Sequence, residues 1–400
     1  MNHSANASAS AIRSKGIFLR QMKRYRPKAI SITSAIEKSP MLRTMDQLYD
    51  CFYEYSRNLL VAKPFETGTP LEKRDASVSE LRVVLPLATD ANSRLKMADS
   101  EGHVRIGRLL EAIDIVAPCS CYMLNRDDTQ MKWFENGSMP RMFVTSRIHS
   151  IDLQPAYSIS PYHDIYLNGK VTWTGEYQTE ATVSVQQNGN TMLSAKLVFS
   201  SLNGSDVTKK LPVNQLNAQT PFEIEILNRR RNVNTCRPPA PQHMALEKPI
   251  IKAGEVAMQT TAVETTTIAH PEHENPYGSV FGGYLVRQGI ETAEMAAKLF
   301  AKSPVKAVTL DNAEFLKVIE IGSILKFNAY VCNVNNPAKT IQICSQAEVL
   351  NEHTKEFEVC DRFLFTFETD QEVDQDLPQV VPHNTQEFVA QWRAKNIPKN

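Results

Sequence analysis

One segment of the chain recurs further along it at a constant offset. Residues 99–117 read DSEGHVRIGRLLEAIDIVA, and residues 275–293, 176 positions later, read NPYGSVFGGYLVRQGIETA. Without any gap, the two segments are identical at five of nineteen positions, where ordinary composition predicts about one. Internal similarity of this kind indicates two copies of one structural unit. The fold must therefore accommodate the same unit twice.

Both copies show the same order of secondary-structure signals. A strand pattern at 77–88 precedes a helical pattern at 103–117, which Pro118 is expected to stop, and a strand at 255–270 precedes a helix at 282–301. Runs typical of strands follow each helix, at 141–153, 164–175, 180–189 and 192–202, and again at 305–316, 323–334, 340–350 and 356–368. This order predicts an α+β fold in which an antiparallel sheet curls around a buried helix.

The same pattern divides the chain into six segments. They are a basic leader at 1–36, a helix (41–60) and loop within 37–76, a first domain at 77–202, a linker at 203–254, a second domain at 255–370 and a polar tail at 371–400. The leader has seven basic residues and no acidic ones, which is typical of a mitochondrial transit peptide, although a disordered basic arm has the same composition. No apolar run reaches the roughly 18 residues of a transmembrane helix.

Charge and cysteine content exclude some function classes. Beyond the leader, the chain carries 37 basic and 44 acidic residues, which argues against nucleic acid as a partner. The seven cysteines lack the spacing of a disulfide framework and are expected to be reduced. Cys119 and Cys121 form a Cys-x-Cys pair without a second pair, so we expect small core residues at the exit of a helix rather than metal ligands.

The glycine-rich loop at 275–283 allows three interpretations. Gly278, Gly282 and Gly283 lack the Lys-Ser/Thr of a P-loop and the spacing of a dinucleotide-binding loop. They do let the backbone approach a ligand closely, and they lead into a helix whose first amides are unpaired and electropositive. Such amides can stabilise the oxyanion that forms when water attacks a carbonyl. Close packing of the loop is the alternative, and Asn275 can either orient the reacting groups or start a turn.

The first copy contains a carboxylate on the apolar side of its helix. Asp114 lies in the apolar stripe of IGRLLEAIDIVA, whereas Arg108 and Glu111 lie off this stripe. Desolvation is expected to raise the pKa of Asp114 and to suit it to general-base work. Capping of a polar pocket or contact with a buried water is the alternative. The matching residue of the second helix is Ile290, which cannot take a proton.

These motifs resemble those of acyl-coenzyme A thioesterases. The loop N-x-x-G-x-x-x-G-G is similar to the signature of that family, and the two-copy arrangement is similar to its mitochondrial tandem-hotdog members, over residues 78–368. Further likeness lies in VRIGRLLEAID, NGKVTWTG, HPEHENPYGSVFGGYLVR and FLKVIEIGSIL. The resemblance implies two tandem hotdog domains, each an antiparallel sheet wrapped around a long central helix, that form a pseudo-dimer within one chain.

The resemblance also implies the residues of the site. Asn275 matches the loop Asn of the family and Asp114 matches the Asp of the partner helix, and both act on a water without a covalent Ser or Cys. The amides of Gly282 and Gly283 complete the site as oxyanion donors. The implied reaction is hydrolysis of fatty acyl-CoA thioesters, a step of lipid metabolism, to free acid and coenzyme A. The absence of a G-x-S-x-G elbow argues against a serine hydrolase of the α/β type.

A second half-site is expected to be degenerate. It would combine Asp99 and Gly107 of the first copy with Ile290 of the second, and Ile106 replaces the first of the paired glycines. We therefore expect one working site per chain. Glu291 follows Ile290 and is expected instead to form a solvated ion pair with Arg287, four residues earlier.

Coenzyme A is part of the substrate and product, so no separate cofactor or metal is expected. His270 and His273 are spaced H-x-x-H but lack the H-E-x-x-H pattern of zinc sites. The residues expected to contact substrate are Gly278, Arg287 and Arg108, and Arg147, Lys306 and the RRR cluster at 229–231 are further candidates for its phosphates.

Two other functions remain open at this point. A hotdog hydratase or dehydratase acting on acyl-CoA would need a His paired with a carboxylate, and His273 is eighteen residues from Glu291. A non-catalytic acyl-CoA-binding protein would not need Asp114. The family resemblance further implies a homo-oligomer of tandem chains, and the leader implies the mitochondrial matrix.

Overall fold

A computed structural model of the chain describes residues 42–45, 47, 71–125, 141–203, 206–217, 224–225, 250–275, 278–369 and 376–396. The expected leader, the RRR cluster and nearly all of the helix expected at 41–60 lie outside these residues. The N-terminal half is defined as residues 77–202, and the C-terminal half as residues 255–370.

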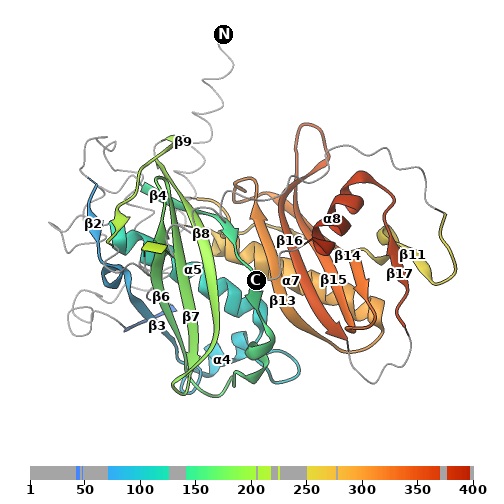
Figure 1. The fold of residues 1–400 in the computed structure, drawn as a ribbon, viewed down its shortest axis with the longest axis horizontal. Coiled ribbons are helices and arrows are strands. Elements are labelled where there is room, and N and C mark those ends of the chain that lie inside the picture. The colour runs from blue at the N-terminus through green and yellow to red at the C-terminus, as the bar shows by residue number, and fades with distance from the viewer. Residues whose placement is uncertain are drawn as a thin grey trace, which may run out of the picture. The chain divides into compact units, whose positions relative to one another are not determined.

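The strands of both halves form one continuous antiparallel sheet (Figure 1). The N-terminal half contributes β3 (Leu81–Leu85), β6 (Ile165–Thr174), β7 (Gln178–Gln187), β8 (Asn190–Asn203) and β4 (Arg141–Ile148), in that spatial order. The C-terminal half continues with β13 (Val305–Phe315), β16 (Phe357–Thr369), β15 (Thr340–Leu350), β14 (Ile324–Asn335) and β12 (Val263–Ile268). β4 pairs with β13 through Ile148 with Ala313 and Arg147 with Glu314, which joins the two halves.

Several short strands complete the described part. β5 (Ile151–Asp152) pairs with β13, and β9 (Asp206–Lys210) pairs with β8. Two parallel pairs lie apart from the large sheet: β2 (Lys73–Arg74) with β10 (Gln215–Leu216), and β11 (Glu255–Ala257) with β17 (Gln379–Val381). β1 (Leu42–Thr44) lies at the start of the described residues.

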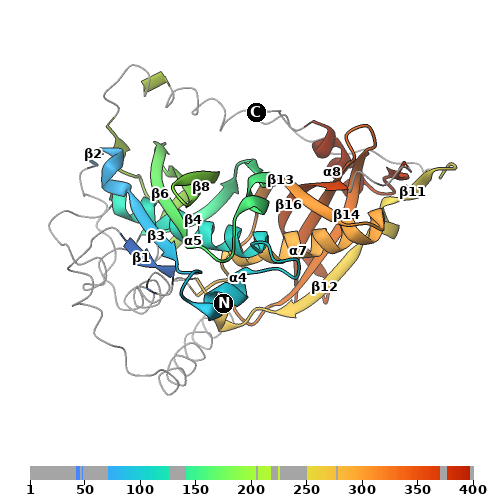
Figure 2. The same ribbon diagram turned by 90° about the horizontal axis from the view of Figure 1, so that it is seen from below.

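Two long helices lie on the same side of the sheet and contact each other (Figures 1 and 2). α5 (Ile106–Asn125) packs on β6 and β7, and α7 (Gly282–Ala301) packs on β14, β15 and β16. The shorter helices are α4 (Ala91–Met97) and α8 (Thr385–Lys395), and the 3-10 turns are η1 (Ala76–Ser79), η2 (Gln154–Ser158), η3 (Met258–Thr261) and η4 (Pro271–His273). No helix in the described ranges is both long enough and apolar enough to cross a membrane.

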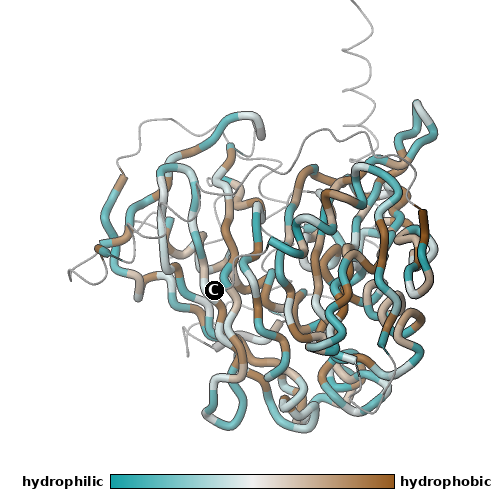
Figure 3. Tube along the Cα trace, turned by 45° about the vertical axis from the view of Figure 1, so that its right-hand side comes forward, coloured by the Kyte–Doolittle hydropathy of each residue, from teal (hydrophilic) through white to brown (hydrophobic). Residues whose placement is uncertain are grey.

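The core lies between the sheet and the two long helices. On β16, Phe363, Phe365 and Phe367 are buried at alternate positions, as a strand with one covered face requires. A Cβ atom on Gly289 of α7 would lie 2.6 Å from the Phe363 ring, so the helix approaches the sheet there as only glycine allows. Figure 3 shows apolar residues in brown interspersed with polar ones in teal along the strands.

The first helix is longer than the sequence predicted. Pro118 lies inside α5, which continues to Asn125, so the expectation that Pro118 stops the helix is wrong. Proline removes one hydrogen bond to the residue four positions earlier, a cost that burial of the following turns offsets. Cys119 and Cys121 are buried within the helix rather than at its exit, and Cys119 Sγ donates to the Ile115 carbonyl at 3.1 Å.

Other element boundaries also differ from the prediction. The strand expected at 77–88 is divided between η1 and β3, and the one expected at 255–270 is divided between β11, η3 and β12. The segment expected to be a polar tail contains β17 and α8. Asn384 caps α8 by accepting a hydrogen bond from the Glu387 N–H at 2.8 Å. An Asn followed three residues later by a Glu is a helix-start signal that the sequence did contain.

Candidate active site

A tight turn precedes α7. The Asn275 side chain accepts a hydrogen bond from the Ser279 N–H (3.1 Å) and donates to the Val280 carbonyl (3.4 Å). The Gly278 N–H donates to the Asn275 carbonyl at 3.1 Å, and Gly278 has a φ of 79°, which side chains other than glycine adopt with strain. Asn275 therefore shapes the turn, and Gly278 provides the backbone conformation that the turn needs.

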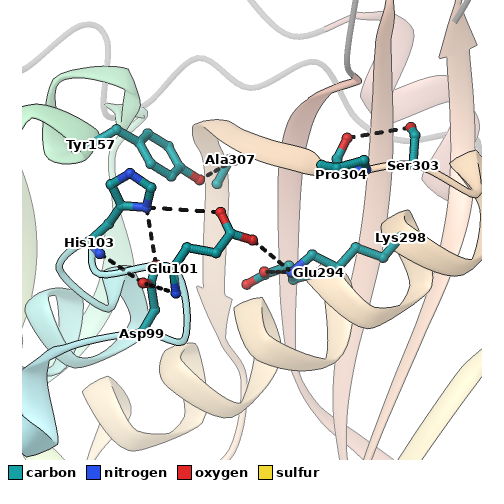
Figure 4. Close-up of polar contacts among 9 residues, drawn as sticks. All are labelled: Asp99, Glu101, His103, Tyr157, Glu294, Lys298, Ser303, Pro304 and Ala307. Atoms are coloured by element: carbon teal, nitrogen blue, oxygen red, sulfur yellow. Dashed lines mark hydrogen bonds and ion pairs between the residues drawn. The ribbon is translucent and has the colours of Figure 1, made fainter.

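The same hydrogen bonds occur 176 residues earlier, in front of α5. The Asp99 N–H donates to the His103 carbonyl (2.9 Å), as the Asn275 N–H donates to that of Ser279 (2.6 Å). The Asp99 carboxylate accepts from the His103 N–H at 2.8 Å, and Gly102 has a φ of 88°. Figure 4 shows Asp99 held inside this turn. The two turns share their backbone design, although one is built on an amide and the other on a carboxylate.

α7 begins against α5 at very close range. A Cβ atom on Gly283 would lie 2.9 Å from both Glu111 Cα and Asp114 Cβ, and one on Gly282 would lie 3.1 Å from the Phe315 ring. The Gly283 N–H donates to Asp114 Oδ2 at 2.6 Å. The crossing thus brings together Asp114 of the N-terminal half and the paired glycines of the C-terminal half.

Asp114 is a buried carboxyl group with an unusual protonation equilibrium. Only 3% of the residue is exposed, and its second oxygen accepts a hydrogen bond from Thr145 Oγ1 at 3.0 Å. Burial raises the pKa of Asp114 to about 6, and the negative charge of Glu111 acts in the same direction, whereas the bonds from Gly283 and Thr145 oppose the rise. Each carboxylate oxygen retains a second lone pair, so the group can also accept a hydrogen bond from a water.

A charged neighbour of Asp114, Glu111, is held by two arginines. The Glu111 carboxylate accepts a hydrogen bond from Arg108 Nη1 at 2.9 Å, and Arg287 Nε of α7 lies 3.0 Å from the same oxygen. Glu111 is 7% exposed and Arg287 is 5% exposed. The expectation that Glu111 lies off the buried face is therefore wrong, because the close approach of α7 covers it. We call Arg108, Glu111 and Arg287 the ion triad.

The same two helices, α5 and α7, make a second close contact at Gly107 of α5. We call this contact the second crossing. A Cβ atom on Gly107 would lie 2.9 Å from Arg287 Cγ and 3.2 Å from Ile290 Cγ2. Gly107 and Ile290 stand 176 residues from Gly283 and Asp114, so the two crossings are built from matching positions. Glu291 bonds Arg105 Nε at 2.8 Å, which contradicts the expected pair between Glu291 and Arg287. The close packing of the halves directs Arg287 to a partner on α5, Glu111, and Glu291 to a partner immediately before α5, Arg105.

Polar contacts surround the turn at Asp99 and link it to the C-terminal half (Figure 4). Lys298 of α7 lies 4.0 Å from a Glu101 oxygen and 2.7 Å from a Glu294 oxygen. The Tyr157 and His103 rings form a T-shaped pair with centroids 5.9 Å apart, and the Tyr157 hydroxyl accepts a hydrogen bond from the Ala307 N–H at 2.6 Å. These groups connect the two halves around a crossing that has no carboxylate in the place of Asp114.

His273 lies in front of α7, stacked on an aromatic ring. Its ring lies 3.8 Å from that of Tyr284, and the guanidinium of Arg287 lies 5.0 Å from the same Tyr284 ring. Burial lowers the pKa of His273 to about 4, opposed by Glu272 and reinforced by Arg287, so the imidazole is neutral at pH 7. Within the described ranges, no three His, Cys, Asp or Glu side chains are grouped so that they could hold a metal ion.

Two further candidates for phosphate binding lie on β4 and β13. The backbone of Arg147 is in register with that of Glu314 where β4 meets β13, and the Lys306 ammonium lies 5.9 Å from the centre of the Tyr157 ring.

Sequence reasoning missed three residues that contact this site. Thr145 on β4 holds one oxygen of Asp114, Phe315 on β13 contacts the first glycine of α7, and Glu111 belongs to the ion triad. Glu111 carried a signal, because it stands one helical turn before Asp114 and residues three apart share a helix face. Thr145 and Phe315 lie on strands far away in the sequence, where no local pattern identifies them.

No family model matches the chain, but curated relatives do. It is 29% identical to the mouse protein named acyl-coenzyme A thioesterase 9, mitochondrial, over 76% of this chain and 74% of that protein. It is 27% identical to the human protein of the same name, over 79% and 77% of the two chains. A hop protein named acyl-coenzyme A thioesterase 4, mitochondrial, is 23% identical over 90% of this chain and 73% of its own.

Solved structures resemble the chain more distantly. An acyl-CoA hydrolase from Staphylococcus aureus matches 35% of this chain and 86% of its own, with 22% identity and a TM-score of 0.33. An acyl-ACP thioesterase from Bacteroides thetaiotaomicron matches 74% of this chain and 100% of its own, with 12% identity and a TM-score of 0.42. The sequence similarities, by contrast, extend over about three quarters of the chain and of each mammalian relative. On this similarity, the chain resembles the mitochondrial acyl-coenzyme A thioesterases over most of its length.

Proposed function

We propose that the protein hydrolyses fatty acyl-CoA thioesters to free acid and coenzyme A at the crossing of α5 and α7. One observation carries the proposal: a buried carboxyl group with a raised pKa, Asp114, lies hydrogen-bonded at the N-terminus of α7. A carboxylate with a pKa near 6 is largely ionised at pH 7 and basic enough to accept a proton from water. The curated relatives, which are named acyl-coenzyme A thioesterases, support the same reaction.

In the proposed mechanism Asp114 acts as the general base. The carboxylate takes a proton from a water as the water oxygen bonds to the thioester carbonyl carbon. The carbon–sulfur bond of the tetrahedral intermediate then breaks, and the proton passes to the thiolate sulfur of coenzyme A. A thioester has little resonance stabilisation and a good leaving group, so an oriented water, a base and an oxyanion donor can suffice.

The two glycine amides take different roles in this mechanism. The Gly283 N–H already donates to Asp114, so we assign it to orienting the base. Among the described residues the Gly282 N–H, the first amide of α7, has no backbone acceptor. We assign Gly282 to the oxyanion, which the positive end of the helix dipole also stabilises. Asn275 holds the turn and is proposed to orient the carbonyl or the water.

The same proposal covers the architecture. The chain is proposed to be a pseudo-dimer of two hotdog domains, at 77–202 and 255–370, with one working site. The matching turns at Asp99 and Asn275 support it, as do the matching crossings at Gly107 and Gly283. Ile290 leaves the second crossing without a base, so the half-site at Asp99 is proposed to be inactive.

The contacts with coenzyme A, the cellular location and the oligomeric state are also proposals. Arg108, which is only partly covered, is proposed to contact the phosphates of coenzyme A, and Gly278 to let the substrate approach the turn. Mitochondrial relatives and the basic leader support a place in the mitochondrial matrix. A homo-oligomer of tandem chains is proposed from the family. Coenzyme A enters as part of the substrate, and no other cofactor is proposed.

The test is thiol release from a series of acyl-CoA substrates of increasing chain length. Wild-type protein should release coenzyme A, and Asp114→Asn and Asn275→Ala should reduce the rate. Full activity in both variants would overturn the assignment of the site. Water addition to an enoyl-CoA without thiol release would instead identify a hydratase, and tight acyl-CoA binding without either reaction would identify a binding protein.

A further inference from the structure

We propose that Arg287 is a positioning residue that acts on Asp114 through Glu111: by balancing the Glu111 charge, it sets the pH range in which Asp114 works as a base. The inference rests on the proposed thioester hydrolysis. It assigns Arg287 to the control of the base, in place of a contact with the phosphates of coenzyme A.

The geometry places Glu111 between Asp114 and two cations. Glu111 stands one helical turn before Asp114 on α5, and both are covered by Gly283 of α7. Arg108 and Arg287 meet the same Glu111 oxygen at 2.9 Å and 3.0 Å. At 5% exposure, with Glu111 on one side and the Tyr284 ring 5.0 Å away, Arg287 is poorly placed to reach a phosphate in solvent.

Asp114 has a charged neighbour, Glu111, and the two arginines contact that neighbour. Glu111 on α5 is the negative group that raises the pKa of Asp114, and Arg108 on the same helix and Arg287 on α7 offset that charge. The other groups that face Asp114 are uncharged: the hydroxyl of Thr145 on β4 and the amide of Gly283.

His273 and Phe315 add no further charge to this surrounding at neutral pH. His273 before α7 is neutral because burial lowers its pKa to about 4, and Phe315 on β13 is apolar. Among the described residues packed there, Glu111 is therefore the ionised group that acts on Asp114, and the two arginines contact Glu111.

Because Arg287 belongs to the C-terminal half, the adjustment depends on the two halves being docked. Asp114 and Glu111 lie on α5, so without α7 the carboxylates would repel each other with only Arg108 to compensate. Charges in a poorly solvated site interact more strongly than in water, so one missing cation has a measurable effect. Docking of α7 thus supplies both the amide that orients Asp114 and the cation that sets the pH range in which Asp114 acts as a base.

The second crossing provides a matched control. Arg105, immediately before α5, also pairs with Glu291 of α7, at 2.8 Å, but beside Ile290 rather than beside Asp114. Breaking this pair removes an ion pair between the two halves without changing the charge next to Asp114. An effect that came only from weaker docking of the helices would appear in this control as well.

The experiment is the pH profile of kcat/KM for acyl-CoA hydrolysis in wild type, Glu111→Gln, Arg287→Gln, Arg287→Lys and Glu291→Gln. Arg287→Gln should shift the acid limb of the profile to higher pH, and Glu111→Gln should shift it to lower pH, each by about one pH unit. At pH 5.5 the rate of Arg287→Gln should fall about tenfold below wild type, and it should recover above pH 8. Arg287→Lys should restore most of the shift, and Glu291→Gln should leave the limb in place.

Several outcomes would overturn the inference. Shifts of the same sign in Glu111→Gln and Arg287→Gln, or no shift in either, would show that the ion triad has only a structural role. A higher KM for Arg287→Gln at every pH, with the limb unmoved, would make Arg287 a phosphate ligand. If Arg287→Gln does not fold, the remaining variants still test the sign of the Glu111 effect. A wild-type protein without thiol release would refute the proposed function itself, which is a separate result.

Discussion

Two glycines bring the long helices together at two crossings: Gly283 lies on Asp114, and Gly107 lies on Ile290. The turns that lead into the crossings have the same backbone hydrogen bonds and the same positive-φ glycine. A difference that decides their chemistry is the side chain beneath the glycine. A carboxylate at the first crossing receives an amide and a hydroxyl, whereas the isoleucine at the second can only pack.

The ion pairs beside the two crossings also differ. Beside Asp114, Glu111 and Arg287 form a buried pair next to a titrating group. Beside Ile290, Arg105 and Glu291 form a more exposed pair with no titrating group to adjust. Glycine packing therefore preserves the same backbone arrangement at both crossings, whereas the side chain beneath the glycine decides whether a crossing can catalyse a reaction.

The largest expected effect comes from removing the base. Asp114→Asn should lower kcat by about 10²–10⁴-fold, because the amide cannot take a proton from water. The matched change at the second crossing, Ile290→Val, should leave kcat within about twofold of wild type and lower stability by about 1 kcal/mol. Steady-state kinetics and urea unfolding of both variants measure this difference, and equal losses of kcat would contradict the assignment of a single working site.

The same residue should make stability depend on pH. The folded-state pKa of Asp114 is about 6, above the ordinary value of 3.8, so the folded protein binds this proton more tightly than the unfolded chain does. The resulting stabilisation is complete below about pH 4 and is lost as pH rises through 6, up to about 3 kcal/mol. The unfolding free energy of wild type relative to Asp114→Asn should therefore be larger at pH 5 than at pH 7.5. A constant difference would argue against the raised pKa.

Adding a methyl group to each glycine tests the packing. Gly283→Ala should destabilise the protein by about 1–3 kcal/mol, since the new Cβ would meet the Glu111 backbone at 2.9 Å. Gly107→Ala should cost less, about 1 kcal/mol or below, because the atoms it would meet belong to the side chains of Arg287, Ile290 and Glu291, which can move. Denaturant unfolding of both variants measures the two losses of stability. A larger loss in Gly107→Ala than in Gly283→Ala would contradict the prediction.

The smallest expected effect comes from the hydroxyl that holds Asp114. Thr145→Val removes a hydrogen bond to the ionised carboxylate, so the pKa of Asp114 should rise by up to about one unit. Activity at pH 6 should then fall several-fold, with little change at pH 8. Ser146→Ala is the matched control, because the Ser146 hydroxyl donates to the Val198 carbonyl instead. A loss that is equal at both pH values would indicate a structural role for Thr145.

Local signals predicted much of this protein correctly. The strand and helix patterns of both halves correspond to β4, β6–β8 and β13–β16 and to the cores of α5 and α7. Predictions failed where packing overrides a local rule, as at Pro118, which lies inside a helix that burial stabilises. They failed too for Glu291, because a helix repeat alone cannot show that the other half of the chain offers Arg105 as a partner.

The sequence by itself determined that the chain contains the same turn and helix twice, with a carboxylate beneath the glycines at one copy and an isoleucine at the other. Tertiary structure alone decided that Asp114 accepts the Gly283 amide, 169 residues away, and that Arg287 meets Glu111 rather than Glu291. The physical reason is that side-chain identity and helix periodicity are local properties. The partners of a buried charge, by contrast, depend on how closely two helices from distant parts of the chain approach each other.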